Sequence, residues 1–426
     1  MKKVLIVFAA VFVTLTSCSE SSDPDTGIKI QRVSPVPQFS SALQSDMHIE
    51  YNTGYIPSNE YIPLNYDEQK SVWISYIDLA PMITGKAKDE FKSAFSQACE
   101  NIKGLGCNTV YVHVRSFGDA YYESAYYPWS KGITGYAGQK PDYDPLEIMV
   151  DCAHQNGLSF HAWINPLRCE TQENLSKLDS GVLSEWYNDT EKYSEYLVKV
   201  KDDEHYWLNP AVEDVRSLIC SGAEELCRNY KIDGIHMDDY FYPTTEEYFD
   251  SEAYIEAGAS MALSDWRLDN CSKMVSEIYD TVKSVNQDIL FGISPQGNIE
   301  NNYSYMYADI KKWCSEDGYI DYIVPQIYFG YDNPTKPFEK TAEEWSDIAK
   351  QGNTKLVIGL APYKIAEEEE FSLNVGIISN QIKTSEKLEN YGGVALYNYI
   401  NIFSPEESLS ERLDKEIVLI KKALTD

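Results

Sequence analysis

The chain has 426 residues, of which 43% are hydrophobic, and a formal net charge of −31. This is enough apolar sequence to bury the core of one large domain or two ordinary ones. The strong negative charge argues against a nucleic-acid partner, because phosphate contacts require a basic surface.

Residues 1–18 are predicted to be a lipoprotein signal peptide. Lys2 and Lys3 precede an apolar run from Val4 to Leu15, which is shorter than the roughly 20 residues of a membrane-spanning helix. The small residues before Cys18 resemble a bacterial lipobox, whose cysteine receives a lipid; an ordinary signal peptide with an incidental cysteine is the alternative. We expect an extracytoplasmic protein that contacts the cell membrane or outer membrane only through this lipid. Residues 19–68 are predicted to be a polar tether and N-terminal extension.

Residues 69–426 alternate between short runs of β-branched and aromatic residues and longer segments of helical periodicity. Eight such runs predict eight parallel strands with right-handed crossovers, the number that closes a (β/α)8 TIM barrel of the α/β class. The predicted strands are Val72–Ile77, Thr109–Arg115, Ser159–Asn165, Gly234–Asp238, Leu290–Gln296, Tyr322–Tyr328, Leu356–Tyr363 and Val394–Ile400. The predicted helices include Asp89–Ile102, Pro145–Gln155, Val212–Tyr230, Trp266–Val285 and Val375–Glu389.

The longest insertions follow the second, third and fourth predicted strands, at residues 116–144, 166–210 and 239–261. All three leave the carboxyl ends of strands, where barrel enzymes build their active sites. An open, doubly wound sheet is the alternative architecture. It would need a Gly-rich phosphate loop after the first strand, and Ser75–Leu79 is not one.

The register of each strand can be read from its apolar residues, because successive side chains point to opposite faces. In the fourth strand Ile235 and Met237 suit the layer under the helices, so His236 and Asp238 should point into the barrel. The same reasoning places these residues inside: His113, Arg115, His161, Trp163, Asn165, Ser294, Gln296, Gln326, Tyr328 and Tyr363. A concave site lined by polar groups at strand ends is typical of an active site.

Asp238 is the main catalytic candidate, because a buried aspartate at a strand end requires an explanation. The alternative is a structural carboxylate satisfied by backbone amides or by Arg115. Asp239 should point the other way if the strand continues. Aromatic residues, Tyr240 among them, crowd the loops at this end, where their rings could stack on sugar faces or pack the loops.

Several motifs occur in a fixed order from about residue 69 to the C-terminus. They are Val112–Tyr122, Tyr127–Ser130, Tyr143–Leu146, His161–Arg168, Asp233–Pro243, Ile293–Pro295 and Asp321–Tyr328. Together they resemble the glycosyl-hydrolase-like family 10 of bacterial exported proteins and lipoproteins. The resemblance implies a glycosidase-type barrel that acts on a polysaccharide, such as the glycan strands of peptidoglycan, and it includes Arg168 and Tyr240 among the site residues. One departure is Gln296–Glu300, where many members have a bulky aromatic residue and then an arginine.

Glycosidases usually place two carboxyl groups about the scissile bond, one protonated and one ionised. We expect Asp238 to be the ionised nucleophile or base, supported by His236 and Arg115, with no metal or cofactor. The candidate acids are Asp239 and Asp119, followed by Glu170, Glu300 and Asp332.

Two other functions remain open. His113, His161 and His236 are predicted to face one cavity and, with Asp238, could form a zinc site for deacetylation of an amino sugar. A non-catalytic glycan-binding surface lipoprotein would keep the aromatic residues but would not need a buried acidic pair.

Overall fold

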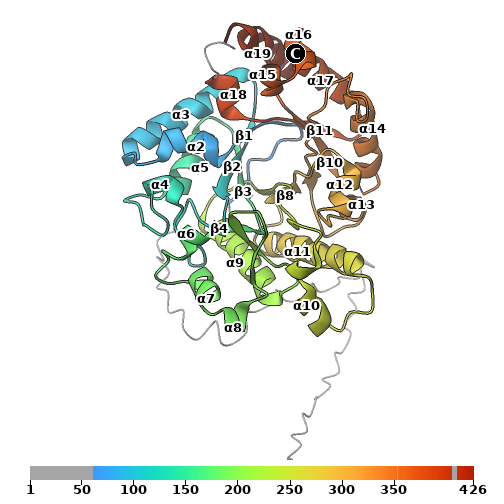
Figure 1. Ribbon diagram of the computed structural model, residues 1–426. Coiled ribbons are helices and arrows are strands. Elements are labelled where there is room, and N and C mark those ends of the chain that lie inside the picture. The colour runs from blue at the N-terminus through green and yellow to red at the C-terminus, as the bar shows by residue number, and fades with distance from the viewer. Residues whose placement is uncertain (1–60, 353, 405–409) are drawn as a thin grey trace, which may run out of the picture. The chain divides into compact units, whose positions relative to one another are not determined.

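The computed structural model describes residues 61–352, 354–404 and 410–426. Eight parallel strands close a barrel in the order β1-β11-β10-β9-β8-β7-β3-β2, which confirms the predicted TIM barrel, and helices surround it (Figure 1). The strands are β1 (Gln69–Ile74), β2 (Thr109–Arg115), β3 (Ser159–Ile164), β7 (Gly234–Met237), β8 (Leu290–Ile293), β9 (Tyr322–Ile323), β10 (Lys355–Leu360) and β11 (Tyr391–Leu396).

Helices follow every barrel strand, as the alternating sequence pattern predicts. The longer ones are α2 (Tyr76–Ile83), α3 (Lys88–Leu105), α5 (Pro145–Gln155), α9 (Glu213–Asn229), α11 (Leu263–Val285), α14 (Phe338–Ala349), α17 (Ile377–Ser385) and α19 (Ser410–Thr425). The short ones are α4 (Lys131–Thr134), α6 (Gln172–Leu175), α7 (Val182–Asn188), α8 (Thr190–Tyr193), η1 (Glu247–Phe249), α10 (Ser251–Glu256), α12 (Ile299–Ser304), α13 (Ile310–Ser315), α15 (Lys364–Glu367), α16 (Glu369–Leu373) and α18 (Tyr399–Phe403). The bounds of α5 match the prediction because Asp144 caps its first turn and Pro145 occupies its first position.

Several strands end earlier than the sequence suggested. β1 stops at Ile74 because Ser75 caps α2 through a capping box with Asp78. The ladder of β8 and β9 is interrupted where Pro295 and Pro325 lack a backbone N–H. Beyond these prolines, pairing persists only as isolated bridges. The carboxyl ends of these strands are therefore loop-like, and the site is built on them.

The barrel interior is unusually aromatic. A cluster of Trp73, Tyr111, Trp163 and Tyr322 fills it, with smaller aliphatic side chains. The space is tight enough that a Cβ added at Gly292 would lie 2.2 Å from the Tyr322 ring, so only glycine fits there. Outside the strands, a much larger apolar core separates them from the helices.

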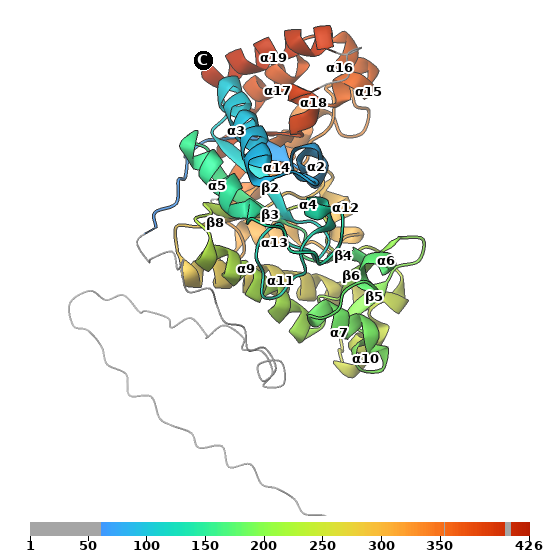
Figure 2. The ribbon, with the colours of Figure 1, turned by 90° about the vertical axis from the view of Figure 1, so that its left-hand side faces the viewer.

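The insertion after β3 carries a small antiparallel sheet that the sequence analysis did not predict. Its strands are β4 (Arg168–Thr171), β5 (Leu197–Lys199) and β6 (His205–Leu208), in the order β4-β6-β5. In Figure 2 this sheet lies with α6, α7 and α10 on one side of the barrel. The insertion therefore adds a wall beside the carboxyl ends of β2, β3 and β7.

The signal peptide, Cys18 and residues 19–60 of the predicted tether lie outside the described residues. The last part of that tether packs on the barrel: the Tyr61 hydroxyl donates to Asp233 Oδ1 at 2.5 Å, and the Leu64 amide donates to the same oxygen at 2.6 Å. Asp233 directly precedes β7, so these contacts are made at the amino end of that strand. Among the described residues, no helix combines the length and apolarity that a membrane crossing requires.

Candidate active site

Asp238 and Asp239 line the same cavity at the carboxyl ends of the strands. β7 ends at Met237, and both aspartates border a space of about 250 Å³. Asp239 was expected to point the other way only if the strand continued, and the strand with its alternation of side chains stops before these residues. The other lining residues are Trp73, Ser75, Tyr76, Ile77, His113, Trp163, Arg168, Tyr240, Ser294, Gln326, Tyr328 and Tyr397.

The two carboxyl groups have different surroundings. Burial and the charge of Asp239 raise the pKa of Asp238 well above its ordinary 3.8, and the Asp238 Oδ1 atom is buried without a hydrogen-bond partner. Burial also raises the pKa of Asp239, but the side-chain amides of Gln296 and Gln326 stabilise its ionised form and oppose the shift. Gln326 Nε2 donates to Asp239 Oδ1 at 3.3 Å. The negative charge of the pair is therefore favoured on Asp239.

Arg168 supplies positive charge to this cavity. Its guanidinium carbon lies 3.7 Å from the ring centroid of Tyr240 and 4.4 Å from that of Phe117. Its charge lowers the pKa of both aspartates, while its buried Nη2 has no hydrogen-bond partner. Arg168 thus opposes the upward shift that burial imposes on the acidic pair, and it keeps a donor available.

Arg115 does not support Asp238, and this prediction was wrong. The β2–β3 pairing shifts register between His113 and Arg115, and this bulge breaks the alternation that would have pointed Arg115 inward. The Arg115 guanidinium instead lies 4.3 Å from the Tyr127 ring centroid. A Cβ on Gly222 of α9 would come within 2.4 Å of its Nη1. Arg115 therefore lies in the helix layer and not at the cavity.

His236 and His161 belong to a hydrogen-bond chain inside the barrel. Trp73 Nε1 donates to His236 Nε2 at 3.0 Å, and because tryptophan only donates, the remaining proton of neutral His236 sits on Nδ1. Nδ1 lies 3.2 Å from the Tyr322 hydroxyl, which in turn lies 2.7 Å from His161 Nδ1. Burial lowers the pKa of His236 well below 6.5 and that of His161 to about 4, so both rings are neutral.

His113 lines the cavity, and its ring is oriented by two partners. The Tyr76 amide donates to Nδ1 at 3.2 Å, and Nε2 lies 3.4 Å from Asn165 Oδ1. Burial, and then the charge of Arg168, lower the pKa of His113 well below 6.5. Asn165 is therefore a support for His113 and is not itself among the lining residues.

The hypothetical zinc site is not assembled. Within the residues that the structure describes, no group of three or more histidine, cysteine, aspartate or glutamate side chains is placed to hold a metal ion. Both ring nitrogens of His236 are engaged by Trp73 and Tyr322, and His161 faces Tyr322. His236 and His161 therefore form hydrogen bonds within the barrel interior.

Tyrosines form a further part of the cavity wall. Tyr328 and Tyr397 line the cavity with ring centroids 6.0 Å apart, and Tyr363 packs at 6.0 Å from each of them. Tyr363 is not among the lining residues and packs behind these two tyrosines.

Gln296 is not among the lining residues either, and it influences the site through its hydrogen bond to Asp239.

Asp119 is not brought together with Asp238. It lines a neighbouring cavity of about 600 Å³, together with Glu170. Its Oδ1 accepts the backbone N–H groups of Ser116 and Phe117 at 3.1 and 2.9 Å. The assignment of Asp119 as the acid that works with Asp238 is therefore not supported by the geometry.

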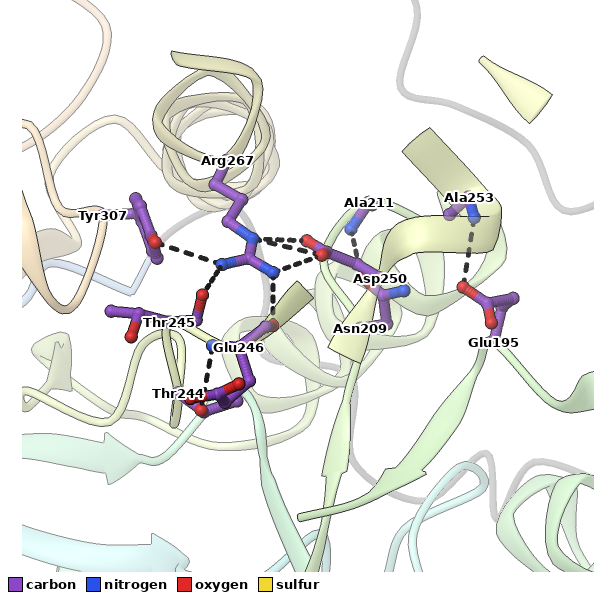
Figure 3. Close-up of polar contacts among 10 residues, drawn as sticks. All are labelled: Glu195, Asn209, Ala211, Thr244, Thr245, Glu246, Asp250, Ala253, Arg267 and Tyr307. Carbon is purple, nitrogen blue, oxygen red and sulfur yellow. Dashed lines mark hydrogen bonds and ion pairs between the residues drawn. The ribbon is translucent and has the colours of Figure 1, made fainter. Parts of the chain in front are cut away.

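The loop that follows Asp239 is anchored by a buried ion pair, shown in Figure 3. Arg267 of α11 donates from Nη2 to Asp250 Oδ1 at 2.6 Å, and both side chains are fully buried. The same guanidinium donates to the carbonyl oxygens of Thr245 and Glu246 at 3.0 and 2.7 Å. Arg267 therefore fixes the path of the segment that leaves the acidic pair.

Sequence reasoning missed three aromatic residues that line the cavity, Trp73, Tyr76 and Tyr397. Trp73 was detectable, because it alternates with Val72 and Ile74 on the first strand. Tyr76 was assigned to a strand that in fact ends at Ile74, and Tyr397 follows the last residue of β11. Their positions depend on where those strands end.

A family model described as glycosyl hydrolase-like 10 matches residues 68–374. The chain is 35% identical over 320 residues to the glycosyl hydrolase YngK of Bacillus subtilis, covering 70% of this chain and 61% of that protein. It is 30% identical over 347 residues to the glycosyl hydrolase DigH of Escherichia coli O6:H1, covering 75% of this chain and 78% of the relative. The chain therefore spans less than two thirds of the Bacillus relative.

Solved structures with a similar fold include the PgaB (BpsB) glycoside hydrolase domain of Bordetella bronchiseptica, with a TM-score of 0.56 and 12% identity. The match covers 81% of this chain and 99% of that one. The catalytic domain of a β-amylase from Paenibacillus polymyxa gives a TM-score of 0.55 at 13% identity, covering 84% and 99% of the two chains. At these identities the likeness concerns the fold.

Proposed function

Because the chain belongs to the glycosyl hydrolase-like 10 family, we propose that it is a glycoside hydrolase whose active site is the cavity around Asp238 and Asp239. The observation that carries this proposal is the pairing of a carboxyl oxygen without a hydrogen-bond partner, Asp238 Oδ1, with a neighbouring carboxyl group whose ionised form is stabilised by amide donors. Such a split between two acidic groups is what glycosidic bond cleavage requires.

Asp238 is the general acid in this proposal, which reverses the roles expected from the sequence. Its raised pKa favours the protonated carboxyl group, and Oδ1, which has no hydrogen-bond partner, would deliver that proton to the leaving glycosidic oxygen. Asp239 is the carboxylate in this proposal, because its amide donors favour the ionised form, and it would stabilise the positive charge that develops at the anomeric carbon. Arg168 opposes protonation of the pair, since its charge lowers both pKa values.

The substrate in this proposal is a polysaccharide of the cell envelope, such as the glycan strands of peptidoglycan. The aromatic and amide lining, with Trp163, Tyr328 and Gln326, suits the apolar faces and hydroxyl groups of sugars. The predicted lipoprotein leader would place the enzyme outside the cytoplasm, next to such a substrate.

The decisive experiment is digestion of peptide-free peptidoglycan strands and of a panel of neutral polysaccharides, with products identified by mass spectrometry. We expect shortened chains with new reducing ends, and we expect no such products from the Asp238→Asn variant. Release of acetate without shortening would instead indicate a deacetylase. Binding without any product from the wild-type protein would indicate a non-catalytic glycan-binding protein.

A further inference from the structure

A second cavity adjoins the active site and is larger than it. The space measures about 600 Å³, against about 250 Å³ around the acidic pair, and Tyr76 lines both. Its walls come from the loop after β2, from α2 and α4, and from the inserted sheet of β4 and β6. A volume of this size lies within the range of small-molecule binding sites.

Glu170 is buried in the wall of this second cavity with one oxygen unused. Its side chain belongs to a residue that is only 2% exposed. The Oε2 atom accepts hydrogen bonds from Asn174 Nδ2 at 2.6 Å and from the Thr171 amide at 3.2 Å. The Oε1 atom is buried and has no partner. An unsatisfied carboxyl oxygen of this kind costs folding free energy, so it calls for a ligand.

The electrostatics of Glu170 make its free oxygen versatile. Burial, and then the charge of Asp119, raise its pKa to about 7. Near neutral pH the group can therefore accept a hydrogen bond when ionised or donate one when protonated. A sugar hydroxyl can serve as either partner.

Glu225 is a buried carboxyl group with a structural role, and it provides a comparison for Glu170. Its pKa is likewise raised to about 7 by burial. Both of its oxygens are used, since Oε2 accepts from Ser124 Oγ and Oε1 accepts from the Ala125 amide, each at 2.6 Å. Glu225 lines neither of the two cavities described above. Glu170 differs from it by having an oxygen left over at a cavity.

The lining of the second cavity carries charges of both signs and many groups that can hydrogen-bond hydroxyl groups. The acidic side chains Asp119, Glu170, Glu173 and Glu204 lie on it together with Lys131 and Lys199. Tyr76 and Phe117 add aromatic surface on the side toward the active site, with ring centroids 4.9 Å apart. Hydroxyl groups and partly apolar faces are the properties of a saccharide chain.

We propose that this second cavity is a subsite for the sugar units next to the bond being cleaved, and that Glu170 Oε1 binds one of their hydroxyl groups. The proposal rests on the glycosidase function proposed above. Under this proposal, Glu170 and Asp119 determine the preference for substrates of different chain length. Asp119 takes no part in cleavage of the glycosidic bond. The substrate chain would pass from the acidic pair across Tyr76 into this cavity.

The test compares a disaccharide with an octasaccharide, both prepared from peptide-free peptidoglycan strands. For each variant, the ratio of the two kcat/KM values is measured. Glu170→Gln should lower the octasaccharide-to-disaccharide ratio about tenfold, because Asn174 and Thr171 need its amide oxygen and the NH2 group left at the position of Oε1 can neither carry charge nor accept a hydrogen bond. Glu225→Gln is the matched control, because it neutralises a buried glutamate of similar pKa at another place and should leave the ratio unchanged. A ratio that falls equally in both variants, or in neither, overturns the subsite.

Calorimetric binding of the two saccharides to the wild-type protein separates this inference from the proposed function. Cleavage with a ratio that is insensitive to Glu170→Gln overturns the subsite alone. Tight binding of the octasaccharide without cleavage overturns the glycosidase function, and the loss of that binding in Glu170→Gln still supports the subsite. If neither saccharide binds or reacts, both proposals fail.

Discussion

Gln326 donates a hydrogen bond to Asp239, whereas Oδ1 of the neighbouring Asp238 has no hydrogen-bond partner. Two adjacent residues of the same type are thereby made chemically unequal. The inequality arises from the loops after β8 and β9, whose side-chain amides reach one aspartate and not the other.

The first prediction separates the roles of the two aspartates. Asp238→Asn should lower kcat about 100-fold or more on a natural glycan but much less on an aryl glycoside whose leaving group needs no proton. Asp239→Asn should impair both substrates, because its charge is needed in either case. Steady-state kinetics of the two variants on the two substrates provide the check. An equal loss for Asp238→Asn on both substrates would contradict its role as the acid.

The second prediction concerns stability and pH. The pKa of Asp238 is raised in the folded state, so below about 3.8 both states hold the proton and its contribution to stability is fully present. As pH rises toward the folded-state pKa, the unfolded chain ionises first and this stability is lost. Asp238→Asn should therefore increase the melting temperature at neutral pH and flatten its decline with pH. Thermal unfolding at a series of pH values tests this; a variant that loses stability as steeply as the wild type would count against it.

The third prediction concerns Gln326, whose side-chain amide stabilises the ionised form of Asp239. Gln326→Leu removes a donor that lowers the pKa of Asp239, so the pKa should rise further. Activity depends on ionised Asp239 and is lost as pH falls through that pKa. The acidic limb of the kcat/KM profile should consequently move to higher pH. An unshifted limb would mean that this limb reports another group.

The fourth prediction contrasts two arginines that lie in different sequence motifs, Arg115 in Val112–Tyr122 and Arg168 in His161–Arg168. Arg168→Met should lower kcat/KM about 10- to 100-fold, because it removes a charge and a free donor from the cavity. Arg115→Met should keep kcat/KM close to that of the wild type, because Arg115 lies against Tyr127 in the helix layer. Circular dichroism would verify that both variants are folded. The opposite ranking would restore the role for Arg115 that the sequence suggested.

The fifth prediction concerns the anchored loop of Figure 3. Arg267→Met leaves Asp250 as a buried charge without a partner and should lower the free energy of unfolding by about 3–5 kcal/mol. Arg228→Met breaks the exposed pair with Glu224 and should cost less than about 1 kcal/mol. Denaturant unfolding compares the two variants. Similar losses of unfolding free energy in the two variants would show that the buried pair of Arg267 stabilises the fold no more than an exposed pair does.

The barrel and the inward direction of His236 could be predicted because successive side chains of a strand point to opposite faces, which is a local property. Ile235 and Met237 pack in the outer core as their alternation with His236 indicates. The same logic failed at Arg115, because a bulge inserts a residue and nothing in the sequence of β2 marks it.

Other parts of the site depend on contacts between distant segments. Asp119 lies in a motif close to the predicted mouth, yet the inserted sheet gives it Glu170 as a neighbour and separates it from Asp238. The roles within the acidic pair depend on Gln296 and Gln326, which approach from strands far along the chain. Sequence alone identified the aspartates but could not rank their pKa values.

The chain of hydrogen bonds from Trp73 through His236 and Tyr322 to His161 has one further consequence. Every proton in it is assigned a position by the indole at its start, so none of its members can accept another proton without losing a partner. This chain of side chains is thus electrically neutral near neutral pH. Ionisation of the two aspartates is consequently governed by groups at the mouth, where an arriving sugar can change their hydration.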